Sequence, residues 1–173
     1  MISRITWITL AASSAVLPAH AATYLNVAQA QQAIFPGATL RESPLKLTPE
    51  QRKTIEKSSG VKVRAVELRV WLVESGGWFV IDEVIGKHEF ITYALGLNAD
   101  GSVRQIEVMD YRENYGSEVR KAGWRVQFAG KKHGAKLKLD DDIKNISGAT
   151  LSCRHIAEGV KRLLATHEFV LKK

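Results

Sequence analysis

The chain has 173 residues, a formal net charge of +7 and 45% hydrophobic residues, the size and composition of one globular domain. Its only cysteine, Cys153, excludes an internal disulfide, so the fold must be held by non-covalent packing. The positive charge is spread along the sequence instead of forming a basic block. This distribution fits an anionic ligand or an acidic partner. Nucleic acid is not expected as a partner, because the sequence has no nucleic-acid-binding motif.

The first residues have the pattern of a secretion signal. Arg4 gives a positive start, Ile5 to Leu17 form an apolar run, and Ala19-His20-Ala21 form a small-x-small cleavage site. The run has about a dozen residues, fewer than the roughly 20 that span a bilayer as a helix. We therefore expect a signal peptide over 1–21 and one domain over 22–173. An uncleaved anchor is the alternative.

Two short helices are predicted before the middle of the chain. Apolar residues spaced as on one helix face favour a helix over Thr23 to Phe35, ended by Pro36-Gly37. Thr48 followed by Pro49 and Gln51 is typical of a capping box with proline in the first turn. The second helix should run to about Lys57.

Four strands are predicted next. The first strand is expected over 66–73 and should have one buried face. Its inward-facing residues would be Val66, Leu68, Val70 and Leu72, which alternate with Glu67, Arg69, Trp71 and Val73. Further strands are expected over Trp78–Ile85, Glu89–Leu97 and Val103–Met109. The turns between them are too short for parallel crossovers, so the strands should form an antiparallel meander.

The rest of the chain should be helical. A helix over Ser117 to Phe128 is weakened by Gly123, whereas Thr150 to His167 has the clearest amphipathic pattern in the sequence. The expected fold class is therefore α+β: a twisted, mainly antiparallel sheet packed by helices, with a C-terminal helix after the loop Ser147 to Thr150.

That loop carries the most informative residues. Gly148 allows a positive φ and a close approach of a ligand to the backbone, and Ala149 is small. Thr150 and Ser152 place hydroxyl groups at a helix N-terminus, where unpaired N–H groups and the helix dipole favour a phosphate. An ordinary helix cap is the alternative interpretation.

The run Ser147-Gly148-Ala149-Thr150 resembles the S/T-G-A-T/S motif of the FMN-binding domain family, found in sodium-pumping and Rnf-type respiratory complexes and in exported single-domain proteins. Two further stretches resemble the family: Gly159 to Arg162 on the last helix, and Ile106 to Glu113 with Gly116 and Glu118. The second stretch resembles the strand and E-x-x-G loop near the flavin. The matched region covers Gly96 to Leu164.

The resemblance implies FMN bonded through its phosphate to the last hydroxyl of the motif, which is Thr150. A flavin transferase of the exported, FAD- and Mg-dependent type would make this bond. The transferase's preferred sequence has Asp three residues before the first Ser/Thr of the motif, where this chain has Lys144. Asp140, Asp141 and Asp142 lie further upstream and are the candidate substitutes.

The residues expected to contact the flavin come from the motif, the E-x-x-G loop and their neighbours. For Glu113 the alternative is a turn cap, for Trp124 a core position, and for Arg154 a solvated side chain. Cys153 and His155 have no partners with metal-ligand spacing, so no metal site is expected, and no catalytic triad or carboxylate pair is recognised. The candidate cofactor-binding residues are Ser147, Gly148, Ala149, Thr150, Leu151, Ser152, Tyr111, Glu113, Gly116, Trp124 and Arg154.

These observations lead to three functional expectations. The first is an exported flavoprotein that transfers electrons and acts as a carrier instead of a stand-alone enzyme. Its location would be the periplasm or another extracytoplasmic compartment. Its partners would be the flavin transferase and a redox protein such as a cytochrome or a membrane electron-transfer complex, through which it would associate with a membrane. The second is a sensory or accessory flavin-binding module. The third is a flavoenzyme for a small exported substrate, which the short chain disfavours.

Overall fold

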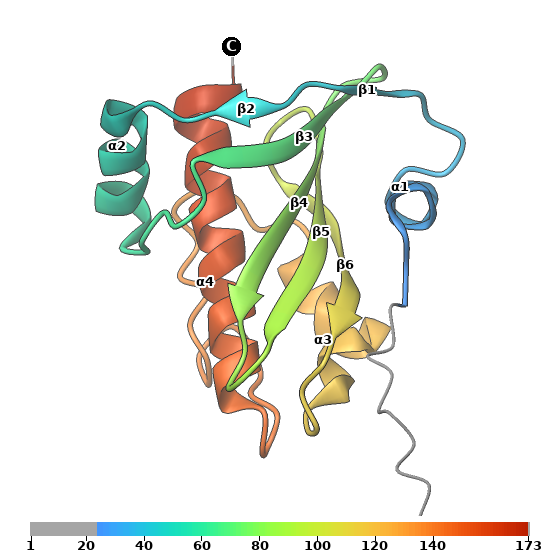
Figure 1. The fold of residues 1–173 in the computed structure, drawn as a ribbon, viewed down its shortest axis with the longest axis vertical. Coiled ribbons are helices and arrows are strands. Elements are labelled where there is room, and N and C mark those ends of the chain that lie inside the picture. The colour runs from blue at the N-terminus through green and yellow to red at the C-terminus, as the bar shows by residue number, and fades with distance from the viewer. Residues whose placement is uncertain (1–23, 173) are drawn as a thin grey trace, which may run out of the picture.

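The computed structural model describes residues 24–172 and has a mixed α+β fold, in which a six-stranded antiparallel sheet is packed against helices. The signal peptide expected over 1–21 lies outside these residues. Figure 1 shows the long C-terminal helix running along one face of the sheet. The predicted fold class is confirmed.

The sheet is a meander of four long strands extended by two short ones. The long strands β3 (Glu67–Val73), β4 (Trp78–Ile85), β5 (Phe90–Leu97) and β6 (Val103–Tyr111) pair in sequence order, each antiparallel to the next. The short strands β1 (Leu40–Glu42) and β2 (Leu45–Lys46) both pair with β3 and were not predicted. They are three and two residues long, too short for an alternating pattern to be recognised.

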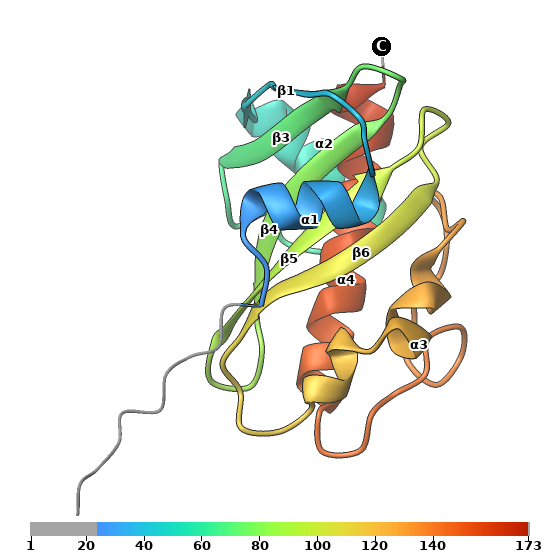
Figure 2. The ribbon, with the colours of Figure 1, turned by 90° about the vertical axis from the view of Figure 1, so that its right-hand side faces the viewer.

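Both faces of the sheet are covered, which corrects the prediction of one buried face on β3. Trp71 and Val73, predicted on the open face, are 8% and 1% exposed because they pack beneath helix α1 (Val27–Ile34) in a second apolar cluster. Figure 2 shows α1 lying across this face, opposite the C-terminal helix α4 (Thr150–Thr166). The larger cluster fills the space between the sheet and α4.

The capping box predicted at Thr48 is present at the start of helix α2 (Pro49–Ser59). The Thr48 side chain accepts from the Gln51 N–H at 3.2 Å, and the Gln51 side chain accepts from the Thr48 N–H at 2.8 Å. A second capping box, between Asn26 and Gln29, starts α1 and shortens the predicted helix by removing its first residues.

The single helix predicted over Ser117 to Phe128 is wrong. The segment forms three short turns instead: η1 (Ser117–Arg120), α3 (Ala122–Arg125) and η2 (Val126–Phe128). Lys121 breaks the helix by adopting an extended conformation, which lets Val119, Trp124 and Phe128 all point into the core. Packing therefore overrides the local helical pattern.

Helix α4 joins the two ends of the molecule. It begins at Thr150, beside the β4–β5 turn and the end of β6, and continues into a π-helical turn, η3 (His167–Leu171), at the opposite end (Figure 1). Eleven of its 17 residues are buried, so its N-terminus is fixed relative to the sheet. Within residues 24–172, no helix is long and apolar enough to cross a membrane.

Candidate functional site

The motif loop ends at a helix N-terminus that no side chain caps. Ala149 occupies the N-cap position of α4 and Thr150 is the first helical residue. Gly148 has a φ of +81°, and the space where its Cβ would lie is empty. Three properties predicted from the sequence therefore occur together: available N–H groups, a left-handed glycine and an open approach to the backbone.

A cavity of about 340 Å³ opens at this helix end, within the size range of small-molecule sites. The α4 end supplies five consecutive lining residues, and two loops of the sheet supply the others. Lys87 and His88 come from the β4–β5 turn, whereas Glu113, Asn114 and Tyr115 follow β6. The α4 residues that line it are Gly148, Ala149, Thr150, Leu151 and Ser152.

Tyr111, at the end of β6, joins the cavity's two walls. Its buried hydroxyl donates to the Tyr115 carbonyl oxygen at 2.5 Å and lies 3.2 Å from Ser152 Oγ. Because the Tyr111 proton is used on Tyr115, the Ser152 hydroxyl is the donor in the second contact. Burial raises the pKa of Tyr111 above its ordinary value, so the hydroxyl remains a donor at neutral pH.

Gly116 brings the E-x-x-G loop against α4. Its φ is +86°, and a Cβ on this residue would overlap the Ala149 side chain and lie 2.8 Å from the Tyr111 hydroxyl oxygen. Only glycine fits both the conformation and the space. Gly116 therefore acts on the site through packing against the motif loop, and it does not line the cavity.

Glu113 caps the β4–β5 turn. One of its carboxylate oxygens accepts from the N–H groups of His88 at 2.6 Å and Glu89 at 3.0 Å. Burial alone would raise the pKa of Glu113, but these backbone hydrogen bonds outweigh burial and hold the pKa below its usual range. Glu113 thus joins the two sheet loops of the cavity as a carboxylate.

Thr150 faces two cavities. Besides the first, it lines a groove of about 700 Å³ at the α4 end, which we call the charged groove. Its charged lining residues are of both signs: Lys136, Lys138, Arg154 and Lys161, with Asp140, Asp141 and Glu158. Its hydroxyl oxygen accepts a hydrogen bond from Asn145 Nδ2 at 3.1 Å. The Thr150 hydroxyl is therefore held at the junction of a cavity that adjoins the sheet loops and the charged groove.

Five predicted flavin-binding residues do not line the first cavity: Tyr111 and Gly116, which pack behind it, and Trp124, Arg154 and Ser147. Trp124 is 7% exposed, packs edge-on against Phe128 with ring centroids 5.2 Å apart, and donates from Nε1 to the Lys144 carbonyl oxygen at 2.8 Å. Arg154 is exposed and lines the charged groove. Ser147 is also exposed, beside the open Gly148. Flavin contacts by these residues stay predictions.

Several lining residues were not predicted. Lys87, His88, Asn114 and Tyr115 reach the cavity because the β4–β5 turn and the β6 end meet at α4. Asn145 contacts Thr150 from the segment before the motif. Their pattern in the sequence is that of ordinary polar loops, so only the tertiary fold reveals them.

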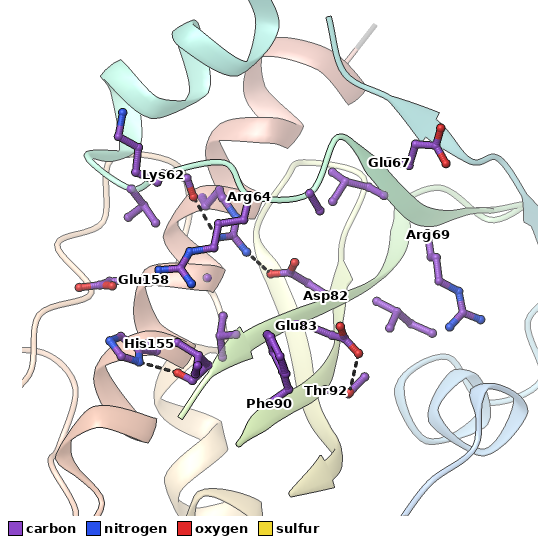
Figure 3. Close-up of a pocket in the computed structure, with 18 of the residues that line it drawn as sticks. Lys62, Arg64, Glu67, Arg69, Asp82, Glu83, Phe90, Thr92, His155 and Glu158 are labelled. Atoms are coloured by element: carbon purple, nitrogen blue, oxygen red, sulfur yellow. Dashed lines mark hydrogen bonds and ion pairs between the residues drawn. The ribbon is translucent and has the colours of Figure 1, made fainter. Parts of the chain in front are cut away.

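A third cavity, of about 700 Å³, lies between β4 and the middle of α4 (Figure 3). Its floor contains a buried ion pair, in which Arg162 donates to Asp82 at 2.6 Å and Asp82 also accepts from the Tyr93 hydroxyl at 2.6 Å. The Asp82 carboxylate is thus already paired, and the hydrogen bonds among Asp82, Tyr93 and Arg162 fasten α4 to the sheet. Within residues 24–172, no group of side chains could hold a metal ion.

The fold and the site define a class of protein: an α+β domain whose C-terminal helix presents an uncapped, glycine-preceded N-terminus to a small-molecule cavity. Residues 86–165 match the family model of the FMN-binding domain. The chain therefore contains an FMN-binding domain over these residues, which confirms the resemblance and implies FMN as the cofactor. No curated protein matches the chain.

The matched residues include all of the first cavity's lining and the whole motif loop. They begin in the β4–β5 turn and end near the C-terminus of α4, so β5, β6 and most of α4 form the shared core. The uncapped helix end and the open Gly148 fit a phosphate monoester or diester, and the adjoining cavity has the size for an attached ring system.

Proposed function

We propose that this chain is an exported flavoprotein that holds one FMN through a bond between the FMN phosphate and Thr150, and that passes electrons between redox partners. The observation that carries the proposal is the Thr150 hydroxyl at the uncapped α4 N-terminus, where it lines both the cavity and the charged groove. A phosphodiester at this position is stabilised by the N–H groups and the helix dipole.

A covalent bond suits an exported protein. A dissociable cofactor that leaves a protein outside the cytoplasm is diluted, whereas a tethered one keeps a high effective concentration. The bond would be made by a flavin transferase of the FAD- and Mg-dependent type. When bound, the flavin supplies the redox chemistry, and the residues of this chain bind it and control its access.

Electron transfer is supported by the exposure of the cavity rim. Tyr115 is 79% exposed and Leu151 is 37% exposed, so a partner can approach the rim closely. We propose a cytochrome or a membrane electron-transfer complex as that partner, reached in the periplasm or another extracytoplasmic compartment after the leader is removed. A sensory or accessory flavin module is the second candidate.

The attachment is tested by export of the protein together with the transferase, followed by a denaturing gel viewed by flavin fluorescence. Wild-type protein should fluoresce, and Thr150→Ala should not. Thr48→Ala is the matched control, because it removes a threonine at another helix start together with the cap hydrogen bond that this side chain accepts. The control should lose about 1 kcal/mol of stability and remain fluorescent.

A fluorescent Thr150→Ala band would refute the assignment of the bond. Electron transfer needs a separate test: stopped-flow mixing of the reduced protein with an oxidised cytochrome. Rapid reoxidation supports a carrier, whereas slow exchange with every donor and acceptor supports the sensory module.

A further inference from the structure

Asn145 makes two hydrogen bonds that fix the orientation of its side-chain amide. Its Oδ1 accepts from the Ile146 N–H at 2.9 Å, and its Nδ2 donates to Thr150 Oγ1 at 3.1 Å. The opposite amide orientation would place two donors face to face at Ile146. The amide nitrogen is therefore the group directed at the Thr150 hydroxyl.

The segment that carries Asn145 is held through both backbone polar groups of the preceding residue, Lys144. The Lys144 N–H donates to Gln127 Oε1 at 2.6 Å, and the Lys144 carbonyl oxygen accepts from Trp124 Nε1 at 2.8 Å. Trp124 is itself buried in the core. Asn145 therefore reaches Thr150 from a fixed position and not from a loose loop.

We propose that Asn145 is the positioning residue for attachment of the flavin, an inference that rests on the proposed covalent function. Thr150 is the first residue of α4, so no preceding helical turn restricts its side chain, and more than one staggered χ1 rotamer is open to its hydroxyl. The amide donor selects one rotamer. It uses one lone pair of Oγ1 and leaves the second lone pair and the hydroxyl proton free.

Those two free groups are what the attachment step requires. The Oγ1 lone pair forms a bond to the phosphorus of the FMN half of FAD, and the bond from that phosphorus to the bridging pyrophosphate oxygen breaks. AMP leaves with the electron pair, and the threonine proton passes to a base of the transferase. Reactions of this kind depend strongly on the alignment of the attacking atom.

Two substitutions separate positioning from the folding of the loop. Asn145→Ala removes both hydrogen bonds. Asn145→Asp keeps the acceptor for the Ile146 N–H but loses the donor to Thr150. Asn98→Ala is the matched control, because Asn98 Nδ2 also donates to a hydroxyl, Ser102 Oγ at 2.9 Å, in the distant β5–β6 turn.

The experiment incubates each purified protein with FAD, Mg²⁺ and the flavin transferase, and follows the FMN adduct by intact mass over time. Thermal unfolding is measured on the same samples before incubation. Both Asn145 variants should be flavinylated about tenfold more slowly than wild type at saturating FAD and transferase, which corresponds to ~1.4 kcal/mol of activation free energy. Asn98→Ala should react at the wild-type rate.

The outcomes distinguish the two proposals. A wild-type protein that gains no FMN refutes the covalent attachment and, with it, the role of Asn145. If Asn145→Ala is flavinylated as fast as wild type, the role of Asn145 is refuted, whereas the covalent attachment stands. If Asn145→Asp reacts at the wild-type rate while Asn145→Ala is slow, the residue only caps the loop at Ile146, and the inference is also wrong.

Discussion

Gly116→Ala should destabilise the protein more than a glycine substitution at positive φ in open space, such as Gly134→Ala. An alanine in the left-handed conformation costs ~1–2 kcal/mol. At Gly116 the new methyl would also overlap Ala149 and lie 2.8 Å from the Tyr111 oxygen, well inside the roughly 3.5 Å of ordinary contact. Such overpacking adds ~1–3 kcal/mol, so the total loss in unfolding free energy should be ~2–5 kcal/mol.

Gly134→Ala separates the two contributions. Gly134 has a φ of +91°, close to the +86° of Gly116, but nothing lies within 4 Å of its added Cβ. It should therefore lose only the ~1–2 kcal/mol of backbone strain. Urea unfolding followed by far-ultraviolet circular dichroism measures both variants. Equal losses at the two positions would show that Gly116 does not hold the E-x-x-G loop against the motif loop.

Two further predictions concern the open glycine and the response to acid. Gly148→Ala should lose about as much stability as Gly134→Ala, because its Cβ also meets open space. Of the two variants, only Gly148→Ala should weaken FMN binding in a fluorescence titration. Unchanged binding would show that Gly148 is not part of the phosphate site. Burial lowers the pKa of His167, so the folded state binds protons less readily than the unfolded one, and stability should fall as pH drops below about 6.5. His167→Gln should flatten this dependence in unfolding measurements, and an unchanged slope would contradict the assignment to His167.

The repeating parts of the fold were predictable from the sequence. Alternating apolar residues and the short turns between them predicted the four long strands. Thr48, Pro49 and Gln51 were enough to predict the capping box. The second buried face of the sheet was not predictable, because Trp71 and Val73 are covered by α1, an element far away in sequence. The break at Lys121 likewise depends on tertiary packing.

The same division holds for the candidate site. The motif loop was recognised because its glycine, small residue and hydroxyls are consecutive, and the structure brings them to one helix end. The β4–β5 turn and Tyr115 were missed because no local pattern marks them as part of a cavity. Trp124 was singled out because it lies near the E-x-x-G loop in sequence. It is buried beside Phe128, and its flavin contact stays a prediction.

The central claim is the bond between FMN and Thr150, and peptide mapping tests it most directly. Trypsin should release the stretch from Asn145 to Arg154, which contains the three hydroxyl residues Ser147, Thr150 and Ser152. Tandem mass spectrometry of protein exported with the transferase should find this peptide heavier by one FMN less one water, with the fragment ions placing the addition on Thr150. An unmodified peptide, or an addition on Ser147 or Ser152, would contradict the account.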